Sequence, residues 1–159
     1  MIEQDVLGAQ DQWAAAIVKI GMAYTAGTDV AAVARNEIDT LYDYSRGKVL
    51  FKPTKCEQRQ FRLTADGALS YFVGHELSKS HVQQPDFPED KGFAIAPYVS
   101  VQFMNAGIIC YRKRAIAMGN YIFTKPDGSS VKVEYTFGYR LRKSGIKINL
   151  HHSSIPFSN

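Results

Sequence analysis

Apolar residues recur with a helical period in the first third of the chain. The face they form consists of Trp13, Ile17, Ile20 and Tyr24. Spacings of three and four positions place these side chains on one side of a helix. Gly27 supplies a stop, and Thr28 or Asp29 is suited to cap the next helix, which we expect from Val30 to about Tyr42. The chain therefore begins with two amphipathic helices.

The middle of the chain holds shorter elements. Residues 48–52 indicate a short strand that ends at Pro53. Residues 64–74 are apolar enough for either a helix or a strand, and Thr64 in a capping position favours a short helix. Residues 76–91 are polar and rich in proline, which is typical of a loop.

The second half of the chain alternates between apolar and polar residues, as half-buried strands do. In chain order we expect a strand over 98–103, a hairpin turn at 105–107, a long strand over 108–124, a turn at 125–128, a strand over 131–141, a turn at 143–145 and a final strand. Gly119 and Gly138 lie inside these strands and mark places where the sheet can bend.

This order of elements predicts the fold class. Helices followed by a long antiparallel meander form an α+β domain, with N-terminal helices packed on one face of a curved antiparallel sheet. At 159 residues, the chain is expected to be a single domain over 1–159. A sheet that curves over helices forms a cone. Its concave side holds an apolar pocket with few polar groups, which is the usual ligand site of this shape.

The final strand carries the most informative polar residues. Its apolar row consists of Ile146, Ile148 and Leu150. Because successive side chains of a strand point to opposite faces, His152 and Ser154 continue this row and are predicted to point into the pocket. By the same alternation, His151 and Ser153 are predicted to face the other side of the sheet.

Charge and hydropathy restrict the partners. The chain has 19 Lys and Arg residues against 15 Asp and Glu residues, a net charge of +4. The basic residues are spread along the chain, so we expect no nucleic-acid partner, and the mild positive charge favours a small anionic substrate or product. No run approaches the ~18 apolar residues of a membrane helix, so we expect no membrane partner.

The N-terminal residues and the cysteines indicate the compartment. Residues 1–12 carry acidic side chains and no basic, apolar leader, which is not typical of a signal peptide, and we expect a cytoplasmic protein. Cys56 and Cys110 are then expected to be unpaired. No CxxC motif is present, so a thiolate metal site is not predicted.

The histidines do not form the pattern of a zinc site. The four histidines are His75, His81, His151 and His152. A catalytic zinc ion needs three protein ligands that converge on it, but the two adjacent histidines of a strand point apart. No HxH or HxxxH spacing is present. We therefore expect no metal site.

Four segments together resemble a known family. They are 50–54 (LFKPT), 68–74 (ALSYFVG), 117–121 (AMGNY) and 150–156 (LHHSSIP). The order of elements resembles the NTF2-like (SnoaL-like) superfamily, and the closing strand is similar to that of the calcium/calmodulin-dependent kinase association domain. More closely, from about Trp13 to Pro156, the chain resembles the iota-class carbonic anhydrases of the metal-free cyanobacterial and algal type.

The resemblance implies reversible hydration of CO2 to bicarbonate, without a metal or another cofactor. It also implies that hydroxyls and an imidazole around the pocket hold bicarbonate, a role that falls on Thr54, Tyr71, His152 and Ser154. Tyr71, Thr54 and Ser154 can each donate one O–H and accept a hydrogen bond. His152 is the candidate general base, since histidine is the side-chain type best suited to take up a proton near neutral pH.

Two other functions remain open on the sequence. The same fold serves as a non-catalytic association or oligomerisation module, and it also serves other small-molecule enzymes such as isomerases and dehydratases. The latter commonly place an inward carboxylate in the cone, and no clear one is found on the predicted strands. Because one sheet cannot bury both faces against its few helices, we expect a homodimer or a larger homo-oligomer.

Overall fold

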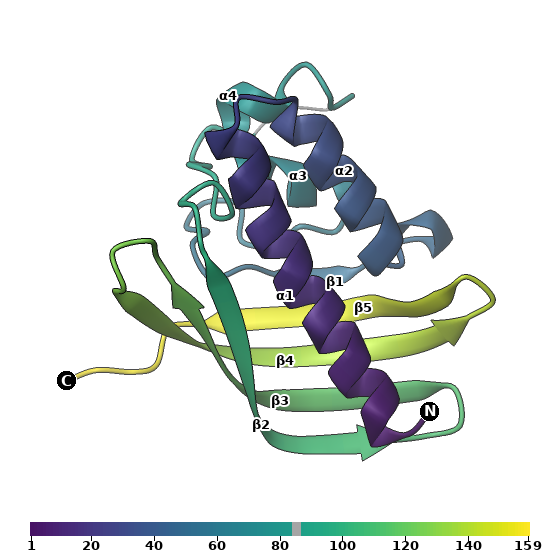
Figure 1. Ribbon diagram of the computed structural model, residues 1–159. Helices are drawn as coiled ribbons and strands as arrows, with labels where there is room; N and C mark the ends of the chain where they lie inside the picture. The colour runs from purple at the N-terminus through teal and green to yellow at the C-terminus, as the bar shows by residue number, and fades with distance from the viewer. Residues whose placement is uncertain (84–86) are drawn as a thin grey trace.

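The computed structural model describes residues 1–83 and 87–159, so residues 84–86 of the predicted loop lie outside the described residues (Figure 1). The described elements are α1 (Glu3–Thr25), α2 (Val30–Leu41), the 3-10 turn η1 (Tyr44–Arg46), β1 (Leu50–Lys52), α3 (Ala65–Val73), α4 (His75–Ser78), β2 (Ser100–Cys110), β3 (Arg114–Thr124), β4 (Ser130–Arg142) and β5 (Gly145–Ser154). The predicted α+β class is confirmed.

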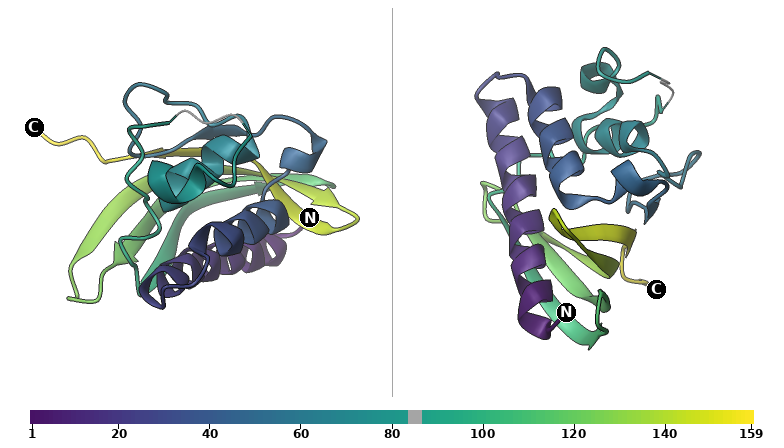
Figure 2. Two further views of the ribbon diagram at one scale, coloured as in Figure 1. Left: turned by 90° about the horizontal axis from the view of Figure 1, so that it is seen from above. Right: turned by 90° about the vertical axis from the view of Figure 1, so that its right-hand side faces the viewer.

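The helices form a layer on one face of the sheet (Figure 2). Helix α1 packs along β2, and α2 lies between α1 and α3. The predicted face of α1 is confirmed for Trp13, Ile17 and Ile20, each at most 2% exposed. The predicted caps are also present, since Asp29 accepts from the N–H of Ala32 and Thr64 accepts from the N–H of Gly67. These side chains satisfy backbone donors at the starts of α2 and α3.

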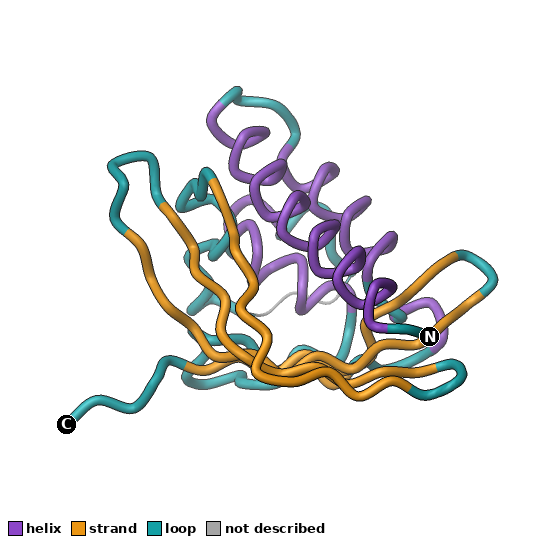
Figure 3. Tube along the Cα trace, turned by 60° about the horizontal axis from the view of Figure 1, so that its bottom comes forward, coloured by secondary structure: helices purple, strands orange, loops and turns teal. Residues whose placement is uncertain are grey.

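The five strands form one open, mixed sheet in the order β1-β5-β4-β3-β2. Strands β2 to β5 pair antiparallel as predicted, but β1 pairs parallel with β5. The prediction of a wholly antiparallel sheet is therefore wrong at this edge. Figure 3 shows the strands bending sharply toward the helices, so that the sheet curves without closing.

The predicted hairpin turn at 105–107 is wrong. Strand β2 continues through these residues, with a register shift between Asn105 and Gly107 opposite Gly119. The turn comes later, where the N–H of Tyr111 donates to the carbonyl of Arg114. A Cβ on Gly119 would lie 2.1 Å from a backbone oxygen of β2, so glycine permits the close approach at this bulge.

A second bulge interrupts the ladder between β4 and β5. Tyr139 of β4 is opposite Ile148 of β5, and the residue before it, Gly138, is opposite Leu150. Asn149 has no partner between them and is therefore the extra residue. A Cβ on Gly138 would lie 2.8 Å from Cβ of Leu150. An extra residue reverses the alternation of every side chain that follows it in the strand. The bulge therefore determines which face the end of β5 presents to the helices.

No helix in the described part of the chain is long and apolar enough to span a membrane. Cys56 and Cys110 are both free thiols.

Candidate active site

The bulge turns His151 and Ser153 into the molecule, where each is 2% exposed. His152 is exposed on the opposite face, and Ser154 Oγ donates there to Glu134 Oε2 over 2.7 Å. The prediction that His152 and Ser154 point into the pocket is therefore wrong. The prediction that His151 and Ser153 face the other side of the sheet is wrong as well. The physical reason is the extra residue in β5, which reverses the alternation.

A small enclosed cavity lies between the helix layer and the concave face of the sheet. Its volume is about 10 Å³, which is just enough for one water molecule. Its lining residues are Trp13, Phe51, Pro53, Thr54, Tyr71, Phe72, Phe93, Tyr121, His151 and Ser153. The structure thus brings two of the predicted residues, Thr54 and Tyr71, together with the imidazole and hydroxyl that the bulge supplies. The remaining walls are mostly aromatic.

His151 is the centre of the polar contacts in this cavity. Its Nδ1 lies 2.8 Å from Tyr42 Oη, and its Nε2 lies 3.0 Å from Ser153 Oγ and 3.2 Å from Tyr121 Oη. The hydroxyls of Ser153 and Tyr121 are also hydrogen-bonded to each other. Burial lowers the pKa of His151 well below its usual value, and the nearby charge of His152 acts in the same direction. The imidazole is therefore neutral at neutral pH.

Tyr71 faces His151 from helix α3. Its ring stacks on Phe93, with 5.5 Å between the ring centroids. Burial raises the pKa of Tyr71 well above 10, although hydrogen bonds with the backbone at Lys55 and the side chain of Thr54 act in the opposite direction. Burial also raises the pKa of Tyr121. Both phenols therefore keep their protons and can donate them in hydrogen bonds.

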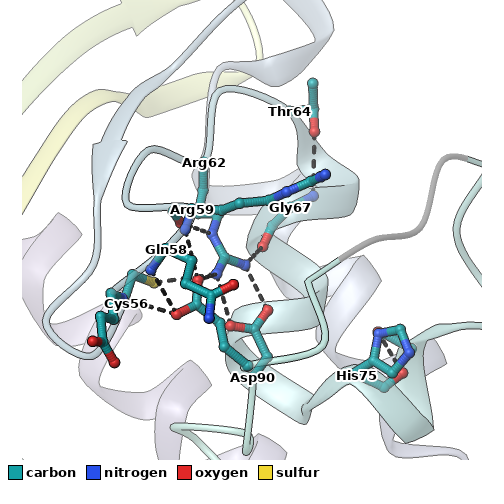
Figure 4. A network of polar contacts seen from close by, with 11 residues as sticks. Cys56, Gln58, Arg59, Arg62, Thr64, Gly67, His75 and Asp90 are labelled. Atoms are coloured by element: carbon teal, nitrogen blue, oxygen red, sulfur yellow. Dashed lines mark hydrogen bonds and ion pairs between the residues drawn. The ribbon is translucent and has the colours of Figure 1, made fainter.

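A buried guanidinium fixes the loop that carries Thr54 (Figure 4). Arg62 is fully buried and donates to both carboxylate oxygens of Asp90, over 2.5 and 2.7 Å. It also donates to the carbonyl of Gly67 at the start of α3 and to Cys56 Sγ. Three segments that surround the cavity thus meet at one side chain.

The carboxylate of Glu89 holds the same loop from outside. It accepts hydrogen bonds from three consecutive backbone N–H groups, those of residues 57–59. Beside it lies a second hollow, which is lined in part by Lys55, Lys91, Tyr71 and Phe93. The rings of Tyr71 and Phe93 line the enclosed cavity as well. They therefore separate this cavity from an outer hollow that is lined by two lysines and by the carboxylates of Glu89 and Asp90.

In the described residues, no group of three His, Cys, Asp or Glu side chains could hold a metal ion. His81 lies 3.4 Å from the carboxylate of Asp29 at the surface, and His151 is occupied by hydroxyl groups. The donor set of the cavity consists of hydroxyls and one imidazole, which suits hydrogen bonding to a small oxygen-containing molecule.

The sequence predicted the wrong facing for His151 and Ser153, and Tyr42 and Tyr121 were missed as well. Tyr121 stands in phase with the buried residues Ala117 and Phe123 of β3, so strict alternation could have identified it. For Tyr42, the sequence indicates only the end of the second helix. No local pattern links it to His151, which lies 109 positions further along the chain.

Known proteins match almost the whole length of the chain. The family model described as metal-independent carbonic anhydrase matches residues 4–155. A metal-independent carbonic anhydrase from Nostoc sp. is 40% identical, over 98% of this chain and 74% of the relative. The solved structure of an iota-carbonic anhydrase from a cyanobacterium, complexed with bicarbonate, has a TM-score of 0.91 and 38% identity, and covers 100% of this chain and 94% of its own.

More distant structures share only the fold. A putative calcium/calmodulin-dependent protein kinase II association domain from Xanthomonas campestris has a TM-score of 0.59 at 18% identity, covering 100% of this chain and 91% of its own. The close matches extend over the whole cavity, from Trp13 in α1 to Ser153 in β5. The chain belongs to the family of metal-independent carbonic anhydrases.

Proposed function

We propose that this protein catalyses the reversible hydration of CO2 to bicarbonate in the enclosed cavity, with its own side chains in place of a metal ion. The observation that supports this most is the convergence of Thr54, Tyr71, Tyr121, His151 and Ser153 on one small cavity. A relative with 38% identity has been solved with bicarbonate bound.

The aromatic walls and the hydroxyls have separate tasks. CO2 is apolar, so the rings of Phe51, Phe72 and Phe93 can contact it. The cavity of the free protein has room for about one water molecule, so these walls have to move apart to admit CO2 beside the attacking water. As the water oxygen bonds to the carbon, one C–O π pair moves onto an oxygen and negative charge develops there. Hydroxyls fixed in advance, such as those of Tyr71 and Ser153, stabilise this charge, and in many enzymes such stabilisation contributes more to the rate than any other effect.

The proton of the attacking water has to leave the cavity. Burial keeps His151 neutral with a low pKa, so this ring is better suited to orient hydroxyls than to store the proton. Hydroxyl groups can pass a proton along, since each accepts one while it donates its own. We place the exit of both products at the Tyr71 and Phe93 rings, where solvent in the outer hollow takes up the proton. The hollow is lined by Lys55 and Lys91 and also by the carboxylates of Glu89 and Asp90.

The proposal is tested by stopped-flow measurement of CO2 hydration on chelator-treated protein, with and without added Zn²⁺. We expect full activity after chelation and no gain from zinc. Ser153→Ala should lower kcat on the order of 10²-fold, because it removes a preorganised donor. Ser154→Ala is the matched control, since this serine lies on the outer face of the same strand. Activity that disappears on chelation and returns with one metal contradicts the proposal.

The outer face of the sheet supports our proposal that the protein is a homodimer or larger homo-oligomer. Large apolar side chains are exposed there on neighbouring strands, among them Met104, Ile116 and Met118 at 52%, 42% and 53%. A second copy of this face would cover them, as oligomer interfaces do. We also propose a cytoplasmic location, which agrees with the two free thiols.

A further inference from the structure

A line of hydrogen bonds runs behind His151, from helix α1 to the cavity. Nε1 of Trp13 lies 2.8 Å from Tyr42 Oη, and this oxygen lies 2.8 Å from His151 Nδ1. On the far side of the ring, Nε2 contacts the hydrogen-bonded hydroxyls of Ser153 and Tyr121. All five residues are at most 2% exposed. Because bulk solvent does not reach them, their protons can be assigned by counting the donors and acceptors within the network and in the cavity.

Trp13 sets the direction of this line, since an indole N–H can only donate. Tyr42 Oη is therefore an acceptor for Trp13, and its own proton needs another partner. His151 Nδ1 is the acceptor in reach. If Nδ1 carried the proton instead, the proton of Tyr42 would be buried without an acceptor among the described residues. With the proton on Nε2, the O–H left unpaired belongs to Ser153 or Tyr121, which line the cavity, so a water or substrate oxygen there can accept it. Tyr42 is not among the lining residues of the cavity. An unpaired buried donor is unfavourable enough to hold the two tautomers at roughly 10:1 or more.

The tautomer of His151 determines whether a free O–H group points into the cavity. With Nδ1 as acceptor, Nε2 carries the proton and donates to the hydroxyl pair. Ser153 and Tyr121 then bond each other through one of their two protons, and the other O–H remains free for an oxygen of the substrate. In the opposite tautomer, one hydroxyl donates to Nε2 and the second donates to the first. No O–H of the pair is then left for the substrate.

We propose that Tyr42, oriented by Trp13, is a positioning residue that fixes His151 as the Nε2–H tautomer, so that the Ser153–Tyr121 pair keeps one O–H for an oxygen of CO2 or bicarbonate. This role in catalysis rests on the proposed function. The tautomer itself is a property of the free protein and can be observed without substrate.

The backbone places Tyr42 for this task. It directly follows α2 in an extended conformation and forms a parallel bridge with Ile148 of β5, where the N–H of Asp43 donates to the Ile148 carbonyl over 2.9 Å. His151 stands three residues further along the same strand. One strand therefore fixes both partners of the hydrogen bond. The low pKa of His151 keeps the ring neutral, as a defined tautomer requires.

The test is long-range ¹H–¹⁵N NMR of the imidazole nitrogens in protein labelled with [¹⁵N]histidine, with His151→Gln to assign the signals. In the unsubstituted protein near pH 7, we expect a protonated Nε2 and an unprotonated Nδ1 on His151. In Tyr42→Phe, Nδ1 loses its partner and is unpaired in both tautomers, as an acceptor in one and as a donor in the other. The Nε2–H tautomer thereby loses a hydrogen bond that favoured it, and we expect the tautomer ratio to fall at least 3-fold. The observation of Nδ1–H in the unsubstituted protein overturns the proposal, and it does so whether or not Tyr42→Phe folds.

Stopped-flow kinetics of the same proteins link the tautomer to turnover. Tyr42→Phe should lower kcat by the same factor as the Nε2–H fraction falls in the NMR measurement, which is about 2-fold for a shift from 10:1 to 1:1, while KM for CO2 stays within 2-fold, because the lost donor acts as charge develops. Tyr44→Phe is the matched control, since this ring stacks on Tyr42 but its hydroxyl donates to the backbone of Arg62. It should keep both the tautomer and kcat. A shifted tautomer with unchanged kcat refutes the catalytic role.

The two proposals fail in different ways. If the unsubstituted protein shows the Nε2–H tautomer but does not hydrate CO2, the proposed function is wrong and the tautomer assignment stands. If it hydrates CO2 with His151 protonated on Nδ1, the assignment is wrong and the function stands.

Discussion

The ion pair of Arg62 and Asp90 should be the interaction on which the loop over the active site depends most. Both side chains are fully buried and joined by two short hydrogen bonds, 2.5 and 2.7 Å long. Removing one partner of a buried pair typically destabilises a protein by about 3–5 kcal/mol. Without the charge of Asp90, the remaining carboxylate near Arg62 is that of Glu89, at the longer distance of 3.6 Å. Asp90→Asn keeps the shape of the side chain and removes its charge, so it isolates this effect.

The expected loss is a large part of the stability of a domain of this size, which is about 5–15 kcal/mol. For roughly 150–250 residues, 1 kcal/mol shifts Tm by about 2–4 °C, so Asp90→Asn should lower Tm by roughly 6–20 °C. The measurement is thermal unfolding followed by circular dichroism, with urea unfolding for the free energy. Glu76→Gln is the control, because the pair of Glu76 and Lys79 is exposed and should contribute almost nothing.

A loss below about 1 kcal/mol in Asp90→Asn would refute this reasoning, because it would mean that the carboxylate of Glu89 is sufficient for Arg62. The double variant Arg62→Met, Asp90→Leu adds a second check. It removes both charges together, so it should be more stable than Asp90→Asn if the unpaired charge causes the loss. If the double variant is less stable than Asp90→Asn, the hydrogen bonds of Arg62 to the neighbouring carbonyls matter more than its charge.

Three further measurements check the site and its surroundings. Thr54→Val should lower kcat for CO2 hydration on the order of 10-fold or more through the loss of a hydroxyl, whereas His152→Ala should leave it within about 3-fold; the reverse result would contradict the facing of β5. Below about pH 6.5, His151 binds a proton in the unfolded chain but not in the folded protein, where it is buried. The free energy of unfolding should therefore fall by up to about 1.4 kcal/mol for each unit by which the pH is lowered. Urea unfolding of His151→Gln should lack this part of the pH dependence. Met118→Lys should shift the sedimentation profile toward the 17.8 kDa monomer; an unchanged profile would show that dimerisation does not use this face.

Local patterns in the sequence predicted most of the fold. The helical period placed Trp13 in the core, and Thr64 identified the start of α3, because capping and helical faces depend on neighbours in the chain. Gly119 and Gly138 were predicted to mark bends, and each lies opposite a bulge. These predictions needed no knowledge of the partner strand.

The facing of the last strand could not be predicted in the same way. Alternation is reliable only while a ladder stays in register. The shift at Asn149 depends on Gly138, eleven positions earlier, whose missing side chain leaves space for Leu150. The turn predicted at 105–107 failed for the same reason, since Gly119 of the partner strand allows β2 to bulge there and continue.

The partners of His151 also come from distant parts of the chain. Trp13 lies in the first helix, Tyr42 after the second and Tyr121 in a central strand. Each is a large aromatic residue with one polar atom, and such residues are usually expected in a core whether or not they have a catalytic role. Only the fold shows that their polar atoms converge on one imidazole.

This convergence explains how a buried core can contain so many polar atoms. An isolated imidazole or hydroxyl is costly to bury, but each of these groups finds a partner in the others. The network has one fixed donor at its closed end, the indole of Trp13, and its open end is the cavity. The proton that cannot be paired inside the network is therefore available where a substrate oxygen can accept it. The arrangement that stabilises the core in this way also prepares the donor that hydration of CO2 needs.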